Sequence, residues 1–144
     1  MRLSLNDYIS IKIHQTDLHL TSYIKNKLEA FNIAPEQNLI MLLLWEKDGQ
    51  SQHQISQKLK KDKTNIARMA VNLEQKGFVH RVNCSEDRRS VKLFLTQEGR
   101  ELGEKVIPIA EDFNDKVIHG ISKEELKLLE ETLTKISKNV DCLL

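Results

Sequence analysis

The sequence predicts a mainly α-helical fold with one small β-hairpin, and three observations indicate it. Apolar residues recur at helical spacing near both ends of the 144-residue chain. Two short helical segments between residues 51 and 76 meet at a tight turn, Lys60-Lys61. Residues 78–95 then show the alternation of apolar and polar side chains that is typical of strands. The length suits one domain with a substantial core, or one compact unit that carries additional dimerisation arms.

The N-terminal part of the chain predicts two helices. Over residues 4–31 the apolar positions are three, four or seven residues apart, so we expect one long amphipathic helix there. Pro35 suits the first turn of a second helix, where its missing N–H costs nothing. This second helix, residues 35–47, is apolar on nearly all sides and is predicted to be the central core helix. The dipeptide Asp48-Gly49 ends it. The apolar stripe of the first helix is formed by Ile9, Ile13, Leu20, Ile24, Leu28 and Phe31.

Two short helices follow, and each has its own capping signal. Ser51 and Gln54 form a capping-box pattern that opens the first of them. Asp62 can cap the second by accepting hydrogen bonds from the free N–H groups of its first turn. Gly77 is placed as the residue that ends the second helix. The side chains predicted to face inward are Ile55 and Leu59 in the first helix and Ile66, Met69, Ala70 and Leu73 in the second.

Residues 78–84 and 90–95 are predicted to be the two strands of a hairpin. In the second strand Val91, Leu93 and Leu95 would lie on one face and Lys92 and Phe94 on the other. The connection formed by residues 85–89 is polar and long for a tight hairpin. We therefore expect it to project from the fold and to move.

The C-terminal part predicts two more helices. Thr96 is a candidate cap for a helix over residues 97–119, which Pro108 should kink and Gly120 should end. A second capping box, Ser122 with Glu125, opens a last helix. We therefore divide the single structural unit into an N-terminal dimerisation helix (1–34), a core (35–96) and C-terminal dimerisation helices (97–144). The apolar stripes outside the core need a partner surface, which a symmetric dimer supplies. In the last helix that stripe is Leu126, Leu129, Leu133 and Ile136.

Charge is distributed unevenly although the formal net charge is only +1. Residues 51–100 carry eleven Lys or Arg against five Asp or Glu, a net charge of +6. Residues 1–50 carry five against six, and residues 101–144 carry six against ten. A basic middle would direct one face of the protein toward phosphate. Solvated lysine-rich helices would give the same pattern, so charge alone leaves both readings open.

The cellular compartment is constrained by what the sequence lacks. No run approaches the roughly 20 apolar residues of a membrane span, and no signal-peptide pattern is present. Cys84 and Cys142 lie far apart in the sequence. We therefore expect a cytoplasmic protein with free thiols.

The second short helix carries the candidate DNA-reading side chains. Helix, tight turn and second helix is the plan of a unit that places its second helix in the major groove of DNA. Arginine can donate two hydrogen bonds to guanine, and asparagine can pair with adenine. Lysines at the turn would hold phosphate instead. The predicted contact residues here are Lys61, Lys63, Thr64, Asn65, Ala67 and Arg68. An ordinary solvated surface helix is the alternative for this helix alone.

The tip of the hairpin provides a second candidate contact. Arg88 and Arg89 are adjacent there, where a purely structural protein gains little from two positive charges. A narrow minor groove attracts an inserted arginine through its enhanced negative potential. Phosphate would repel Asp87, so we expect Asp87 to orient one of these arginines or Arg68 through a charge-assisted hydrogen bond.

Taken together, these motifs resemble the winged helix-turn-helix core of the MarR family of bacterial regulators. The resemblance covers nearly the whole chain. Its most specific part is Asp87-Arg88-Arg89 followed by the pattern Leu-Thr-x-x-Gly at residues 95–99. Two departures are Ala34, where the family often has a capping Thr, and Ser56, where Ala is usual. The other matching segments are residues 55–59, 62–68 and 73–79.

The resemblance implies a homodimer that binds a near-palindromic double-stranded DNA operator. Each protomer would place its recognition helix in a major groove and its wing arginine in the adjacent minor groove. Such regulators are commonly repressors that are released by a small molecule or by oxidation. Reactive cysteines of redox-sensing relatives generally lie in the first helix, and this chain has none there.

An effector site is the least determined feature. His14, Tyr23 and Trp45 are candidates for a cavity between the dimerisation helices and the DNA-binding core, although core packing is the favoured reading of Tyr23 and Trp45. The histidines show no metal-site spacing, and we predict no cofactor.

Two other function classes compete with DNA-binding regulation. A winged-helix module that binds proteins but not DNA would be expected to lose the basic helix and wing charges, which this chain retains. An enzyme would need a nucleophile–base pair, a metal cluster or a phosphate loop, and none stands out. We therefore predict a non-enzymatic regulator of transcription.

Overall fold

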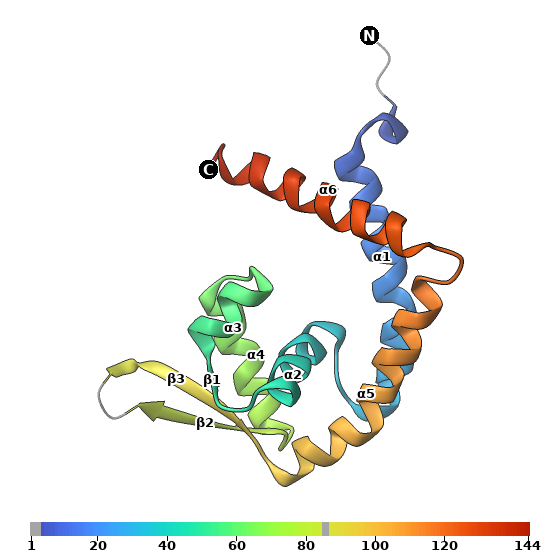
Figure 1. The fold of residues 1–144 in the computed structure, drawn as a ribbon. Coiled ribbons are helices and arrows are strands. Elements are labelled where there is room, and N and C mark those ends of the chain that lie inside the picture. The colour runs from blue at the N-terminus through green and yellow to red at the C-terminus, as the bar shows by residue number, and fades with distance from the viewer. Residues whose placement is uncertain (1–3, 85–86) are drawn as a thin grey trace. The chain divides into compact units, whose positions relative to one another are not determined.

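The computed structural model describes the backbone of residues 4–84 and 87–144, and the side chains of these residues except 87–89. The mainly helical prediction with a small sheet is confirmed (Figure 1). The helices are α1 (Ile9–Leu28), α2 (Pro35–Glu46), α3 (Gln52–Leu59), α4 (Lys63–Gln75), α5 (Gln97–Val117) and α6 (Lys123–Asp141). The strands are β1 (Gln50–Ser51), β2 (Val79–Cys84) and β3 (Asp87–Leu95). Short 3-10 turns, Leu5–Asp7 and Glu29–Phe31, flank α1.

The sheet contains one more strand than the sequence predicted. β1 pairs antiparallel with β3, which gives the strand order β1-β3-β2. β1 has only two residues, and both are polar, so no alternation could reveal it. Its pairing joins the segment between α2 and α3 to the hairpin.

The hairpin connection is shorter than expected. β3 begins at Asp87 instead of residue 90, so the predicted five-residue connection was wrong. The pairing register shifts between Asn83, which opposes Val91, and Cys84, which opposes Asp87. This irregularity breaks the alternation on which the prediction relied. Residues 85–86 lie outside the described residues. In Figure 1 the β2–β3 hairpin extends beyond the helices of its unit.

The first helix is also shorter than the predicted span of residues 4–31. It ends at Leu28, and the 3-10 turn after it ends at Phe31 and is followed by Asn32, whose φ of 56° is left-handed. Asparagine tolerates this conformation better than most residues. The helical spacing of the apolar residues continued through both flanking turns, which is why the pattern overestimated the helix.

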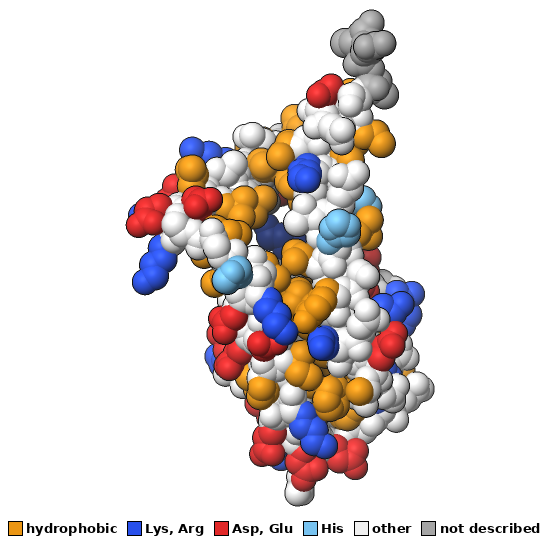
Figure 2. Space-filling view, turned by 90° about the vertical axis from the view of Figure 1, so that its right-hand side faces the viewer, with side chains coloured by type: hydrophobic (Ala, Val, Ile, Leu, Met, Phe, Trp, Pro, Cys, Tyr) orange, Lys and Arg blue, Asp and Glu red, His pale blue; other side chains and the backbone are white. Residues whose placement is uncertain are grey.

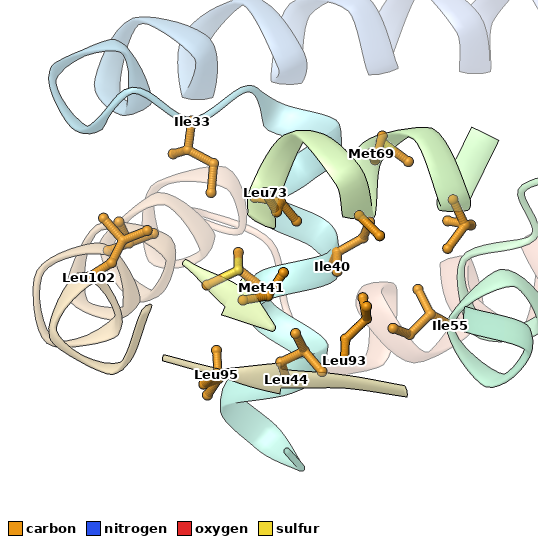
Figure 3. Close-up of a cluster of buried hydrophobic side chains, with 14 of the residues drawn as sticks. Ile33, Ile40, Met41, Leu44, Ile55, Met69, Leu73, Leu93, Leu95 and Leu102 are labelled. Carbon is orange, nitrogen blue, oxygen red and sulfur yellow. The ribbon is translucent and has the colours of Figure 1, made fainter. Parts of the chain in front are cut away.

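The hydrophobic core is built by five helices and the sheet. Side chains from α2, α3, α4, α5 and β3 converge in Figure 3, with Ile40, Met41 and Leu73 near the middle. Leu28 at the end of α1 is fully buried in the same cluster. The core therefore holds α4 and the root of the hairpin in fixed positions.

The chain divides into two compact units, Met1–Ile109 and Ala110–Leu144. The boundary lies one residue after Pro108, which has no N–H to continue the hydrogen bonding of α5. The first half of α5 belongs to the first unit, because Leu102 and Val106 are buried in its core. The sequence-based division, which assigns residues 97–144 to the dimerisation helices, stays a prediction.

Candidate nucleic-acid interface

The turn between α3 and α4 is held by side-chain hydrogen bonds. The Oγ of Ser51 accepts from the N–H of Gln54 at 3.1 Å, which confirms the capping box of α3. The chain leaves α3 at Lys60 with a left-handed φ of 54°. Ser56, which is 8% exposed, donates its Oγ–H to the carbonyl oxygen of Lys61 at 2.5 Å. This bond stabilises the turn between the two helices.

The start of α4 is capped as predicted. The carboxylate of Asp62 accepts a hydrogen bond from the N–H of Asn65 at 2.7 Å. The predicted inner stripe is confirmed, since Ile66, Met69, Ala70 and Leu73 are all buried. The opposite face of α4 is therefore turned toward solvent along its first two turns.

That outward face carries most of the predicted DNA-contact residues. Lys63, Thr64 and Arg68 are exposed, whereas Asn65 and Ala67 are half-buried. Arg68 donates from Nη2 to Oδ1 of Asn65 at 2.6 Å. The structure thus brings these five residues to one accessible helix face, which the helical spacing had indicated.

Lys61 differs from this group. Its Nζ lies 3.1 Å from Oε1 of Glu36 at the start of α2, and only 24% of its side chain is exposed. A lysine that is already paired with a carboxylate is a weaker phosphate ligand than a free one. The partner was not predicted, because Glu36 is 25 residues away in sequence.

The C-terminal end of α4 is anchored to the start of α2 and to the segment just before it. Nζ of Lys76 donates to the carbonyl oxygen of Asn32 and to Oε1 of Gln37, each at 2.8 Å. Oε1 of Gln37 also accepts from the N–H of Ala34, so α2 has a partial cap although Ala34 provides no capping side chain. The N–H groups of Gly77 and Phe78 bond back to α4 in the predicted glycine termination.

The hairpin is tied to α4 through a carboxylate. Glu74 accepts from the backbone N–H of Arg81 at 2.8 Å and from its Nε at 3.1 Å. The backbone N–H of Arg81, followed by its guanidinium, lowers the pKa of Glu74 below its usual value. The position of β2 is therefore coupled to the position of α4.

The pattern Leu-Thr-x-x-Gly joins the hairpin to α5. Oγ1 of Thr96 donates to the carbonyl oxygen of Gly77 at 2.6 Å and accepts from the N–H of Gly99 at 2.9 Å. A Cβ on Gly99 would lie 2.1 Å from the carbonyl oxygen of Phe78, so only glycine fits there. The carbonyl of Gly99 accepts from Nε1 of Trp45 at 2.9 Å. The motif thus connects the base of the β2–β3 hairpin to the end of α4 and the start of α5.

The loop before α3 forms a second connection to the hairpin. Oδ1 of Asp48 accepts from the N–H of Leu95 at 2.8 Å and from that of Gly49 at 2.9 Å. Gln50 is almost fully buried, and its Nε2 donates to the carbonyl oxygens of Leu43 and Lys47 while its Oε1 accepts from Lys58. The sequence reading missed Gln50, because a lone glutamine carries no pattern.

The predicted wing contacts lie at the start of β3. β3 carries the backbone of Asp87, Arg88 and Arg89. Their side chains lie outside the described residues. The role of Asp87 in orienting an arginine accordingly remains a prediction.

The three effector candidates occupy different environments. Trp45 is half-buried against the core, and Gly99 occupies its N–H. His14 and Tyr23 are exposed on α1, so the core packing expected for Tyr23 does not occur within this chain. Shallow hollows of about 430 Å³ beside Leu5–Asp7 and of about 400 Å³ beside Asp115, Lys116 and His119 include none of the three candidates.

The described residues also bear on metal binding, on the state of the two cysteines and on membrane insertion. Within it, no three His, Cys, Asp or Glu side chains are grouped as a metal ion would require. Cys84 is half-buried and Cys142 is exposed, and both are free thiols as predicted. No helix in residues 4–84 or 87–144 has the length and apolar character needed to cross a membrane.

Comparison with known proteins identifies the relatives of this chain. The family model for the MarR family matches residues 33–91. The organic hydroperoxide resistance transcriptional regulator of Bacillus subtilis is 31% identical over 134 residues, which cover 91% of this chain and 88% of that protein. The transcriptional regulator BilQ of Clostridium symbiosum is 29% identical over 82% of each chain. S. aureus MepR, solved as a DNA complex, has a TM-score of 0.84 and 25% identity over 92% of this chain and 98% of its own.

Proposed function

The chain belongs to the MarR family, and we propose that it is a homodimeric, sequence-specific regulator of transcription that binds double-stranded DNA in the cytoplasm. The observation that carries this proposal is the outward face of α4. Arg68 lies there with no carboxylate among the described side chains within ion-pair distance, unlike Arg81, which Glu74 neutralises. An exposed, unneutralised arginine on a rigidly held helix is suited to the edge of a base pair.

The structural neighbour MepR, which was solved with DNA, supports a DNA partner for this chain. We infer that α4 enters the major groove and that Lys63, Thr64 and Ala67 contact the duplex beside Arg68. The wing arginines Arg88 and Arg89 would reach the minor groove, with Asp87 as their orienting residue. Lys61 would contribute to phosphate binding only after its pair with Glu36 loosens.

A second copy of the chain is the proposed partner of the apolar residues that remain uncovered. No residue of α6 is buried, and its large apolar side chains Leu128, Leu129 and Leu133 are 64%, 52% and 38% exposed. In α1, Ile9 and Leu18 are also exposed. Figure 2 shows hydrophobic side chains open to solvent on one face of the molecule. Patches of this kind mark protein interfaces, and a two-fold dimer would match a near-palindromic operator.

Release from DNA by a small molecule is the proposed form of regulation, and repression is the proposed sign. His14 and Tyr23 remain the candidate ligand contacts, because both are exposed on α1. Trp45 is a weaker candidate, since its N–H is already bonded to Gly99. Oxidation is a weaker candidate signal, because α1 contains no cysteine.

Selection of genomic fragments by the purified protein tests this function. We expect a few fragments to be bound with a Kd of about 10⁻⁸ M or tighter, and the affinity to fall steeply with salt. Fluorescence anisotropy with the selected fragment and a scrambled fragment of the same length provides the comparison. Equal affinity for both fragments would contradict sequence-specific recognition.

A further inference from the structure

We propose that Asn65 is a positioning residue that holds Arg68 in its base-reading orientation, and that it is not itself a second base reader. This inference rests on the proposed DNA-binding function. It assigns the base preference of this part of α4 to Arg68, and it makes the neutral amide of Asn65 responsible for the orientation of the Arg68 guanidinium.

The geometry supports this assignment. Nη2 of Arg68 lies 2.6 Å from Oδ1 of Asn65, one helical turn earlier. Residues three apart are neighbours on a helix surface, so the bond forms without distortion. Asn65 is half-buried, whereas Arg68 is exposed. The more enclosed residue therefore supports the more accessible one.

Asn65 is itself held in place. Its backbone N–H donates to the carboxylate of Asp62 at 2.7 Å, and the next residue, Ile66, is fully buried in the core. Asp62 thus holds the backbone at Asn65, and the side chain of Asn65 in turn contacts the guanidinium of Arg68. This support reduces the freedom that a long arginine side chain would lose on binding DNA.

The two side chains also differ in the hydrogen bonds that they can still make once they are bonded to each other. Reading adenine with two hydrogen bonds requires both the oxygen and the NH₂ group of asparagine, and one of the two lone pairs of Oδ1 in Asn65 is already used by Arg68, whose guanidinium lies beside the amide. The guanidinium has five N–H donors, so one bond to Asn65 leaves enough for a bidentate contact with guanine. The pair is therefore better suited to read one base through Arg68 than two bases independently.

The choice of partner preserves the charge of Arg68. An amide orients the guanidinium without neutralising it, whereas Glu74 places a carboxylate on Arg81. Arg68 keeps its full positive charge for the negative surface of DNA. This difference separates a positioning contact from a purely structural ion pair.

The test measures the affinity of the full-length protein for the selected operator and for all of its single-base-pair variants. The proteins compared are the wild type, Asn65→Ala, Arg68→Ala and the double variant, with Asn72→Ala as the matched control on the same helix. Thermal unfolding of each protein verifies that it is folded.

We expect Arg68→Ala to lose a preference of about tenfold or more at one base pair. Asn65→Ala should weaken the preference at that same base pair, and the double variant should bind no worse than Arg68→Ala alone. Asn65→Asp, which keeps the accepting oxygen, should retain the base preference while binding all sequences more weakly. Asn72→Ala should leave the preference intact.

Two results would overturn the inference while leaving the proposed function in place. One is that Asn65→Ala removes a preference at a different base pair from Arg68→Ala. The other is that the two losses multiply in the double variant. An unmodified protein that shows no preference among fragments would instead reject the proposed function, and this inference with it.

Discussion

The two compact units of this chain differ in how much of their own apolar surface they bury. In the first unit, residues from α1 to α5 and the sheet bury a common core, and buried side chains such as Ser56 and Gln50 have their hydrogen-bonding partners within it. In the second unit, α6 is capped correctly by Ser122 but buries none of its residues. The first unit thus builds a core of its own and leaves apolar residues uncovered only outside that core, such as Ile9 and Leu18 on α1, whereas α6 in the second unit has no buried residue at all.

This difference separates two kinds of evidence for function. In the first unit, the tight packing makes the few exposed and unneutralised groups on α4 informative. In the second, the information lies in the lack of packing, since an amphipathic helix gains most of its stability in proteins from tertiary contacts. Substitutions in the core and on α4 should therefore change folding or DNA recognition, and substitutions of the exposed apolar residues of α6 should change association.

The largest expected effect belongs to Gly99→Ala in the first unit. A helical Gly→Ala change ordinarily stabilises a protein by up to about 1 kcal/mol. Here the new Cβ would lie 2.1 Å from the carbonyl oxygen of Phe78, so we expect a loss of about 3 kcal/mol of unfolding free energy. Urea denaturation measures it.

The matched control for this change is Gly120→Ala. A Cβ at Gly120 meets nothing within 4 Å, and only its φ of 75° opposes the substitution. We expect a loss of about 1 kcal/mol there. Equal losses in both variants would show that the backbone of Phe78 is not tightly packed against Gly99.

The next effect concerns the second unit. Leu129→Glu combined with Leu133→Glu should shift the protein from dimer to monomer, because charges would enter the apolar stripe of α6. Sedimentation velocity at several concentrations measures the shift. Lys127→Glu, away from that stripe, is the control and should remain dimeric. A double variant that stays dimeric would remove α6 from the proposed interface.

A smaller effect is expected from Ser56→Ala in the helix-turn-helix turn. Loss of the hydrogen bond to the Lys61 carbonyl should cost about 1 kcal/mol of unfolding free energy. The control, Ser10→Ala, changes an exposed residue of α1 and should be neutral. Thermal unfolding of both variants provides the comparison, and an equally neutral Ser56→Ala would mean that the turn does not need this bond.

The smallest effect is the pH dependence of the Glu74–Arg81 contact. Because folding lowers the pKa of Glu74, its stabilisation is present above the ordinary glutamate value of about 4.3 and is lost as the pH falls through the folded value. The difference in Tm between wild type and Glu74→Gln should be constant near neutral pH and should shrink below about pH 4. A difference that grows on acidification would contradict this contact.

Local signals in the sequence predicted much of the fold. The caps Ser51, Asp62 and Ser122 and the terminating Gly77 each act within a few residues, and all four occur as predicted. β1 was missed because two polar residues form no period. The hairpin bulge was missed because it interrupts the alternation used to recognise a strand.

The candidate site was predictable only in part. The outward face of α4 follows from helical spacing, so the placement of its five residues away from the core could be predicted, while their contact with DNA stays a prediction. The pairs Glu36–Lys61 and Gln37–Lys76 join residues that are distant in sequence, and no local pattern reveals such contacts. The bond between Asn65 and Arg68 lies within one helical turn, but the choice between base reading and mutual support needs the side-chain geometry.

Native mass spectrometry of the protein with its selected operator tests the central claim most directly. The claim is that a self-contained reading unit acts on DNA only in pairs that the remaining apolar surface holds together. It predicts two chains on each duplex for the wild type, a weaker complex of the same stoichiometry for Arg68→Ala, and loss of the two-chain complex for the Leu129→Glu, Leu133→Glu variant. A single chain bound to the duplex with full sequence preference would contradict the account.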